Sequence, residues 1–321
     1  MSDDKKKQIE AAIAKLDKQY GSGTIFKMDA ADVPRVESFS TNAITLDRAL
    51  GVGGVPRGRF TEIYGPESSG KTTVALHIIA SAQKQGCTAA IIDTEHAVDL
   101  EYAARLGVDV DSLLVSQPDS GEQALDIVEV LVRAGVECIV LDSVAMLIPE
   151  AEIKGEMADL QIGQQAKLMS KAMRKLTAPV HEANCALIFI NQIRDKIGGY
   201  GNPEVTPGGR ALRFAASVRI DLRRAETLRD KEENVGIEIK AKVVKNKVAK
   251  PHRTALFSIY FGTGIDKEAT LLDVAADKGI LVKSGTWWSY NGNNIGQGAA
   301  RAIEWLKAHP QEMDEIEAAC A

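Results

Sequence analysis

Residues 64–73 read YGPESSGKTT, and they constrain the fold of this chain more than any other stretch. Gly65, Gly70, Lys71 and Thr72 fit the pattern G-x-x-x-x-G-K-[ST], in which a loop between a strand and a helix wraps its backbone N–H groups around phosphates. In such loops the lysine reaches the β- and γ-phosphates and the hydroxyl ligates Mg²⁺. An accidental glycine-rich turn is the alternative. We therefore predict that ATP or GTP binds, with Mg²⁺, at Gly65, Pro66, Glu67, Ser68, Ser69, Gly70, Lys71, Thr72 and Thr73.

The sequence around this loop alternates short apolar runs with helical patterns. Candidate strands cover residues 60–65, 88–95, 138–143 and 186–193, and candidate helices cover residues 72–84, 121–134 and 167–177. This alternation is typical of an α/β fold with a mostly parallel central sheet. Three further apolar runs, at 217–224, 236–245 and 257–262, are spaced as hairpins at one side of the sheet. We assign residues 34–267 to this domain.

The two ends of the chain differ from the middle. In residues 1–33, Ile9, Ile13, Leu16 and Tyr20 recur at helical spacing, and Gly21 is a stop signal. One helix with a narrow apolar stripe forms no core, so it is expected to pack on its own chain or on another copy. Residues 268–321 hold two helical patterns and are expected to form a small α+β domain.

Composition favours a cytoplasmic protein. The first ten residues, MSDDKKKQIE, are too polar for a signal peptide, and no apolar run is long enough for a membrane span. The four cysteines, Cys87, Cys138, Cys185 and Cys320, have no C-x-x-C pairing, and we expect them to be free thiols.

Polar residues stand where three candidate strands end. Asp142 ends CIVLD, where a carboxylate holds Mg²⁺ directly or through water. Glu95 ends the run before it and is placed to deprotonate an attacking water, or else is a solvated acid. Gln192 closes ALIFINQ, where an amide beside the γ-phosphate would sense hydrolysis; a polar residue with no special role is the alternative.

Two long connections and a basic segment indicate a second ligand. The connections cover about residues 150–165 and 194–210, and long loops in a compact domain are usually functional. Residues 194–254 carry a net charge of +7 within a chain of net charge −5. This segment is either a polyanion surface or a solvated sheet face. Lys245 and Lys247 either belong to a solvated edge or reach a nucleotide on a neighbouring subunit.

Taken together, these motifs resemble those of the bacterial RecA recombinase family. The resemblance rests on ALGVGGVPRGRFTEIYGPESSGKTT, IIDTEHAVD, VLDSVAMLIPEAEIKGE, LIFINQIRDKIG, GGRALRF, KVVKNK and SYNGNNIGQG, in the order of the family. The resemblance implies a RecA-type ATPase core, an N-terminal helix–strand arm that packs on the adjacent subunit, and a small C-terminal domain.

The resemblance also implies roles for particular residues. Lys71 and Thr72 match the phosphate and magnesium residues, Glu95 the base, Asp142 the metal-side carboxylate and Gln192 the γ-phosphate sensor. Asp99 and Tyr102 match adenine contacts, Lys245 and Lys247 match a pair that reaches ATP across the subunit interface, and Phe214 matches an interface residue.

The two long connections match the DNA-binding loops of the family. The positions that match contacts to the primary strand are Ile162, Gly163, Ser170, Arg174, Arg194, Lys196, Ile197, Gly208, Gly209 and Arg210. Lys240 and Lys242 match the positions thought to hold the second duplex. Cations and backbone amides hold phosphates without reading sequence, and apolar side chains wedge between bases.

The function implied is homologous recombination and DNA repair by an ATP-dependent filament on single-stranded DNA. The filament pairs this strand with homologous double-stranded DNA, and it is also expected to stimulate self-cleavage of the repressor of the DNA-damage (SOS) response. Two alternatives share the same core. A ring helicase would form closed rings, whereas a scaffold would use ATP only as a switch.

Overall fold

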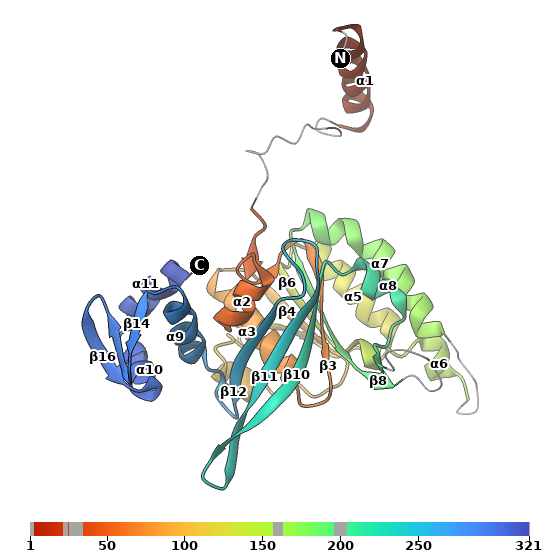
Figure 1. Ribbon diagram of the computed structural model, residues 1–321. Coiled ribbons are helices and arrows are strands. Elements are labelled where there is room, and N and C mark those ends of the chain that lie inside the picture. Colours follow the sequence, from red (N-terminus) through yellow and green to blue (C-terminus); the bar gives the residue numbers. More distant parts are fainter. Residues whose placement is uncertain (1–2, 22–24, 26–34, 157–162, 196–203, 321) are drawn as a thin grey trace. The chain divides into compact units, whose positions relative to one another are not determined.

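The computed structural model describes residues 3–21, 25, 35–156, 163–195 and 204–320 (Figure 1). The chain divides into two compact units, Met1–Val36 and Glu37–Ala321. The first unit contains helix α1 (Asp3–Tyr20), which ends where the sequence predicts and in which no residue is buried. An 18-residue helix with no buried face gains nothing from packing within its own unit.

The second unit is built around a large mixed sheet. Its parallel strands are β3 (Arg59–Gly65), β4 (Ala89–Asp93), β5 (Leu114–Ser116), β6 (Cys138–Asp142), β7 (Ala186–Gln192) and β10 (Val218–Asp230). Antiparallel pairing continues through β11 (Glu233–Asn246), β12 (Thr254–Tyr260) and β13 (Gly264–Ile265). In the described part of the chain the order is β13-β12-β11-β10-β3-β7-β6-β4-β5. The expected mostly parallel α/β sheet, with hairpins at one side, is confirmed.

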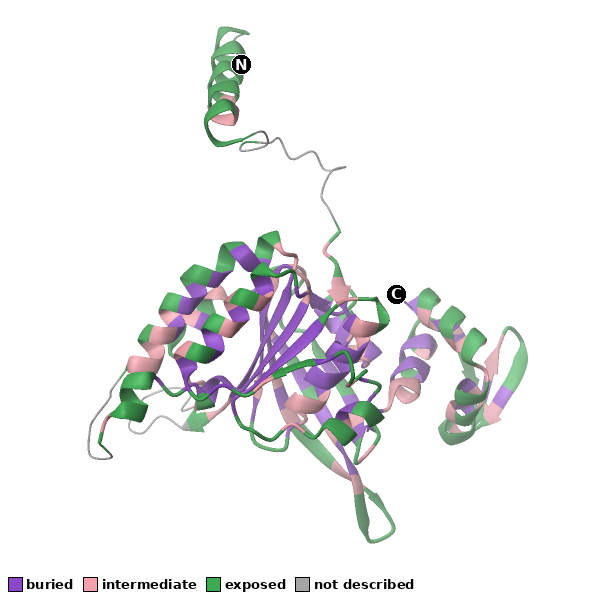
Figure 2. Ribbon diagram, turned by 180° about the vertical axis from the view of Figure 1, so that it is seen from behind, coloured by how far each residue is buried: buried purple, intermediate pink, exposed green. Residues whose placement is uncertain are grey.

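The central strands β3, β4, β6 and β7 are buried because their side chains alternate between two apolar cores, one on each face of the sheet. Ile63 of β3 lies in one core and Phe60 of the same strand in the other. The first face is covered by α2 (Ile44–Leu50) and α3 (Lys71–Lys84), and the second by α5 (Gly121–Arg133), α7 (Gln164–Glu182) and α8 (Arg210–Ala215). Figure 2 shows the buried strands between these layers. Side chains that alternate between two apolar layers explain the near-continuous apolar runs of the sequence.

Several boundaries differ from the sequence-based expectation. Strand β4 ends at Asp93, so Glu95 lies two residues beyond it. Strand β11 ends at Asn246, which leaves Lys247 outside the strand. The long connections contain a short helix α6 (Glu150–Lys154) and a small hairpin of β8 (Arg194–Asp195) and β9 (Glu204–Val205). Apolar periodicity gave no signal for these two-residue strands.

The C-terminal segment has a core of its own. Its elements are α9 (Lys267–Asp277), β14 (Leu281–Ser284), β15 (Trp287–Tyr290), β16 (Asn293–Gln297), α10 (Ala299–Ala308) and α11 (Pro310–Cys320). Leu271, Trp288 and Leu306 are buried in this core, and Ile44 from α2 packs into it. The domain boundaries at 33/34 and 267/268 remain predictions.

The smaller elements complete the described chain. They are β1 (Ser38–Phe39), β2 (Val55–Pro56), α4 (Leu100–Arg105) and the 3₁₀ turn η1 (Val144–Met146). Across the described ranges, no helix combines the length and the apolar character that a membrane crossing requires. All four cysteines are free thiols, and Cys138, Cys185 and Cys320 are buried.

The stability of the fold is expected to fall in acid because of His77 on α3. Its Nε2 accepts a hydrogen bond from the Ile265 amide at 3.0 Å, and burial lowers its pKa from 6.5 to about 4. The unfolded chain therefore binds the proton first, so the free energy of unfolding decreases as the pH falls from about 6.5 to about 4, by up to about 3 kcal/mol. Chemical denaturation measures the free energy of unfolding at each pH. For His77→Gln this decrease is expected to be absent, whereas the variant His252→Gln, at an exposed histidine, is expected to keep it. Equal pH profiles for the two variants would contradict the assignment.

Candidate nucleotide and DNA site

The glycine-rich loop lies at the carboxyl end of β3 and leads directly into α3. Gly65 must lack a side chain, because a Cβ there would lie 2.2 Å from the Leu222 carbonyl oxygen of β10. Gly70 occupies the N-cap of α3 with φ of 80°, a conformation that L-residues rarely adopt. The loop is thus held against the sheet, with the N-terminus of a 14-residue helix at its end. This is the arrangement that binds phosphate in P-loop proteins.

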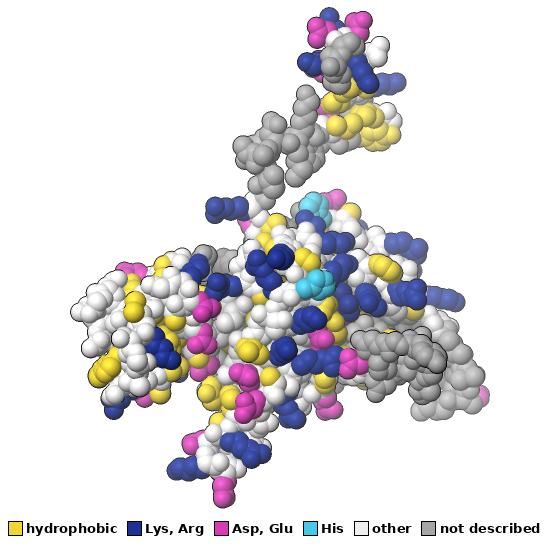
Figure 3. Space-filling view, viewed as in Figure 1, with side chains coloured by type: hydrophobic (Ala, Val, Ile, Leu, Met, Phe, Trp, Pro, Cys, Tyr) yellow, Lys and Arg dark blue, Asp and Glu magenta, His cyan; other side chains and the backbone are white. Residues whose placement is uncertain are grey.

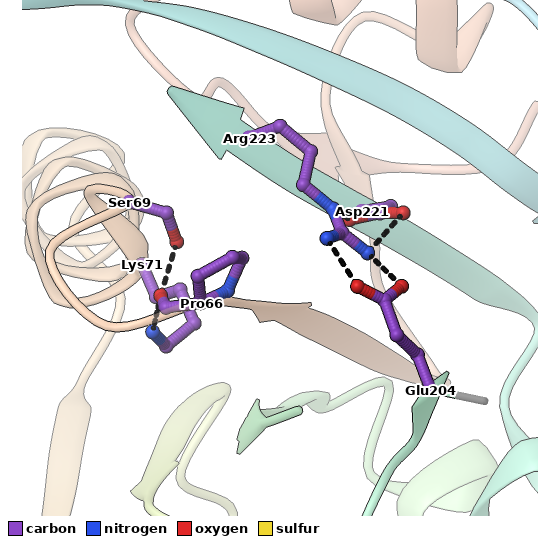
Figure 4. Close-up of polar contacts among 6 residues, drawn as sticks. All are labelled: Pro66, Ser69, Lys71, Glu204, Asp221 and Arg223. Carbon is purple, nitrogen blue, oxygen red and sulfur yellow. Dashed lines mark hydrogen bonds and ion pairs between the residues drawn. The ribbon is translucent and has the colours of Figure 1, made fainter. Parts of the chain in front are cut away.

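Lys71 adds a cation to the loop. Its Nζ donates to the Pro66 carbonyl oxygen at 2.7 Å, and Ser69 Oγ donates to the same oxygen at 2.8 Å (Figure 4). Burial lowers the pKa of Lys71, while Asp142 and Glu95 oppose that change. The ammonium group is therefore partly desolvated, and a desolvated cation attracts an anionic ligand more strongly than one in bulk water.

Thr72 and Asp142 are brought together as predicted for a magnesium site. Thr72 Oγ1 donates to Asp142 Oδ2 at 2.7 Å. Burial raises the pKa of Asp142 to about 6; the Thr72 hydrogen bond opposes this, and Glu95 and Asp93 add to it. These oxygen donors fit Mg²⁺, which prefers oxygen ligands and keeps several waters. The described residues contain no group of three His, Cys, Asp or Glu that could hold a metal by themselves.

Glu95 contacts two residues that come from neighbouring strand ends. Ser143 Oγ donates to Glu95 Oε1 at 2.6 Å, and Gln192 Nε2 donates to the same oxygen at 2.9 Å. Ser143 is fully buried, and its backbone is fixed by two hydrogen bonds to the Thr94 hydroxyl. Both donors therefore engage Oε1. The sequence analysis predicted roles for Glu95 and Gln192 separately; it missed Ser143 and the direct contact.

Asp99 and Tyr102 lie at helix α4, beside α3. Asp99 Oδ1 caps this helix by accepting a hydrogen bond from the Tyr102 amide at 2.9 Å. The Tyr102 hydroxyl lies 3.1 Å from Thr73 Oγ1 at the end of the phosphate loop. The cap therefore places an aromatic side chain next to the loop, as an adenine contact would require.

Lys245 is remote from the phosphate loop of its own chain. It pairs across the sheet with Arg219, which in turn pairs with Glu62. Glu62 lies three residues, or roughly 10 Å, before Gly65 at the end of β3. Lys245 Nζ donates to the Arg213 and Phe214 carbonyl oxygens, each at 2.8 Å. Burial, then Lys247 and Arg219, lower its pKa to about 8.

Phe214 lies in the last turn of helix α8, and its carbonyl oxygen contacts this lysine. Its side chain is 69% exposed, although it is a large apolar residue. An exposed phenylalanine next to a cation that does not reach its own phosphate loop is compatible with an interface between subunits.

The described ends of the two long connections meet beside the nucleotide site. Gly208 packs against Val144 and Met169, and Gly209 packs against Ala166. Gln165 joins them: its Oε1 accepts from the Gly208 amide at 3.1 Å, and its Nε2 donates to the Val144 carbonyl at 2.8 Å. Val144 is two residues beyond Asp142, so Gln165 links the end of β6 to both connections. The sequence analysis missed this residue.

The other predicted DNA residues are distributed around this junction. Gly163 precedes α7, and Ser170 and the exposed Arg174 lie one turn apart on that helix. Arg194 and Arg210 are exposed at the two ends of the second connection. Ile162, Lys196 and Ile197 lie outside the described residues.

Cations also extend along β10 and β11. Lys240 and Lys242 are exposed and lie opposite Arg223 and Asp221. Figure 3 shows Lys and Arg side chains gathered over α7, α8 and the adjoining strands. Arg223, which lies opposite Lys240, belongs to this row, yet no sequence motif had indicated it.

A buried polar cluster in the sheet is hydrogen-bonded to the C-terminal part of the second connection. Glu62 is fully buried and accepts hydrogen bonds from Arg219 Nε at 2.5 Å and from Asn191 Nδ2 at 2.9 Å. Asn191 Nδ2 also donates to the Pro207 carbonyl oxygen at 3.2 Å. The residue before Gln192 is therefore tied to the end of the second connection.

The sheet, the glycine-rich loop at the end of β3 and the helix that follows define an α/β protein of the P-loop class. Two family models match the chain: the RecA N-terminal domain over residues 7–266 and the RecA C-terminal domain over residues 269–320. The chain belongs to the RecA family.

Relatives match over nearly their whole length. Protein RecA of Clostridium novyi is 55% identical over 319 residues, which cover 99% of this chain and 91% of the relative. Protein RecA of Nautilia profundicola is 56% identical over 320 residues, with 99% and 91% covered. Protein RecA of Geobacter sulfurreducens is 55% identical over 320 residues, with 99% and 95% covered.

Proposed function

We propose that this protein is a DNA-dependent ATPase that forms a helical filament on single-stranded DNA, pairs it with homologous duplex and exchanges strands in recombination and repair. Membership of the RecA family supports the general role. The observation that carries the mechanism is the hydrogen bond between Gln192 and Glu95, because it joins the strand that leads into the second connection to the carboxylate beside the phosphate loop.

In this mechanism the phosphate loop binds the triphosphate of ATP. Backbone amides at the start of α3 and the Lys71 ammonium hold the phosphate oxygens. Thr72 and Asp142 would hold Mg²⁺, which when bound neutralises charge on the β- and γ-phosphates. Asp99 and Tyr102 contact the base.

Glu95 acts as the general base. Ser143 and Gln192 both donate to Oε1, so the carboxylate is oriented and Oε2 is left to accept a proton from water. When the γ-phosphate is present, the Gln192 amide has a second acceptor within the site. A change of its partner would move the end of β7 and, through Asn191 and Pro207, the second connection.

DNA binds where the two connections meet. Gly163, Ser170, Arg174, Arg194, Gly208, Gly209 and Arg210, together with Ile162, Lys196 and Ile197, hold the primary strand, mainly through its phosphates. Lys240 and Lys242 hold the second duplex. Lys245 and Lys247 complete the active site of a neighbouring subunit, against which Phe214 packs. The filament is also expected to promote self-cleavage of the repressor of the DNA-damage response.

Reciprocal coupling tests this proposal. We expect a non-hydrolysable ATP analogue to raise the affinity for a fluorescent thymidine oligonucleotide by about 5–150-fold, and the oligonucleotide to raise the affinity for the analogue by the same factor. Fluorescence anisotropy measures the first affinity and calorimetry the second. Gln192→Ala is expected to reduce both factors, since it removes the contact that links the sites. Independent binding of the two ligands would refute the proposal.

A further inference from the structure

A cluster of arginines beside the second connection encloses a cavity, and of its lining residues the proposed mechanism uses only Gly209 and Arg210. The cavity has a volume of about 510 Å³, and its lining includes Arg210, Arg213, Arg219, Arg223 and Glu204. Arg219 is paired with the buried Glu62. Among the described residues, the exposed side chains of Arg210 and Arg213 form no ion pair. The cavity is therefore lined by more positive charge than its own acids neutralise.

One carboxylate from the second connection forms a two-pronged contact with an arginine of this cluster. Arg223 Nη1 and Nη2 donate to Glu204 Oε1 and Oε2 at 2.8 and 2.6 Å (Figure 4). Arg223 Nε donates to Asp221 Oδ1 at 2.7 Å. A guanidinium forms the same two-pronged contact with a phosphate. A DNA phosphate that binds Arg223 must therefore displace Glu204.

The pair is placed where displacement is feasible. The side chains of Arg223 and Glu204 are each 33% exposed, so water and an incoming phosphate can reach both partners of the pair. Glu204 begins β9, which pairs with Arg194 and Asp195 of β8, so the carboxylate moves with the hairpin at the base of the second connection. Asp221, by contrast, lies within β10 and stays with the sheet.

The pair also lies next to the phosphate loop. Leu222 stands between Asp221 and Arg223, and its carbonyl oxygen packs against Gly65, the first glycine of that loop. Figure 4 shows the loop residues Pro66, Ser69 and Lys71 on one side and the ion pair on the other. A shift of the phosphate loop therefore displaces the Leu222 backbone and, with it, the neighbouring Arg223.

We propose that the arginine-lined cavity is a phosphate site for DNA and that Glu204 is its internal competitor, a carboxylate that closes the site until a DNA phosphate replaces it. This inference rests on the proposed DNA binding. It assigns Glu204 a negative contribution to DNA affinity, although this residue lies within the connection that binds DNA. Release of Glu204 also frees the β8–β9 hairpin, so occupation of the cavity and rearrangement of the second connection occur together.

Salt titration of DNA binding tests the proposal. The probe is a labelled thymidine oligonucleotide bound in the presence of a non-hydrolysable ATP analogue, for the native chain, Glu204→Gln and Glu226→Gln. Glu226 is exposed on the same strand as Arg223 and makes no ion pair in the described structure, so its variant controls for the loss of one negative charge. Glu204→Gln is expected to bind about 3–10-fold more tightly than Glu226→Gln, with a slope of log K against log salt steeper by about 0.7.

A second variant keeps the test decisive. In the double variant Glu204→Gln/Arg223→Gln, both the affinity gain and the additional slope are expected to disappear, because the freed guanidinium is gone. Equal affinity and slope for Glu204→Gln and Glu226→Gln would overturn the proposal, as would weaker binding by Glu204→Gln. If the native chain itself fails to bind the oligonucleotide, the proposed function fails; if it binds and Glu204→Gln changes nothing, only the competitor role fails.

Discussion

Lys245→Ala is expected to lower the rate of ATP hydrolysis on single-stranded DNA by about 10³–10⁵-fold, the largest effect of any substitution considered. The side chain lies two strands away from its own phosphate loop and set back from it, yet it is surrounded by the positive charges of Lys247 and Arg219. A cation placed in this way is suited to a phosphate supplied by another subunit. Steady-state turnover with saturating DNA measures the loss, and the exposed Lys250→Ala serves as the control.

Mixing experiments separate action in trans from a structural role for Lys245. Lys245→Ala and Glu95→Gln each lack one half of the site, but in a mixed filament some interfaces carry Glu95 from one subunit and Lys245 from its neighbour. Equal mixing places both residues at about a quarter of the interfaces, so turnover is expected to return to about that fraction of the native rate. A mixture no more active than its components would show that Lys245 does not act across an interface.

Glu95→Gln is expected to lower turnover by about 10²–10⁴-fold while leaving nucleotide affinity nearly unchanged. The amide keeps the size of the side chain and still accepts hydrogen bonds from Ser143 and Gln192 through its oxygen, but it cannot take a proton from water. Single-turnover hydrolysis measures the chemical step, and titration with a fluorescent ATP analogue measures binding.

Two outcomes distinguish a general base from a residue that only supports the site. If Glu95 only supports the fold of the site, the variant will lose nucleotide affinity together with turnover. If it is the base, the defect will lie in the chemical step alone. Retention of native turnover by Glu95→Gln would exclude it from catalysis.

Those parts of the site that follow a recognisable motif were predictable from the sequence. The phosphate loop is set by glycine spacing, and the contact between Thr72 and Asp142 follows once Asp142 is placed at the end of a parallel strand near that loop. The mostly parallel sheet was predictable for the same reason, since apolar runs with two buried faces are typical of central parallel strands.

Contacts that depend on strand order were not predictable. Glu95 and Gln192 are 97 residues apart, and they meet only because β6 lies between β4 and β7 in the sheet. Glu204 and Arg223 meet because a two-residue strand pairs within a connection that has no apolar periodicity. The resemblance to the RecA family supplied roles for single residues, but no pairwise contacts.

ATP turnover by the native chain, measured with and without single-stranded DNA, shows whether DNA completes the ATPase. We expect slow turnover by the free protein and strong stimulation when saturating thymidine oligonucleotide is added, because assembly on DNA brings Lys245 of one subunit to the phosphate loop of the next. Turnover that is equally fast with and without DNA would show that each subunit hydrolyses ATP alone, and would contradict both the coupling through Gln192 and the active site shared between subunits.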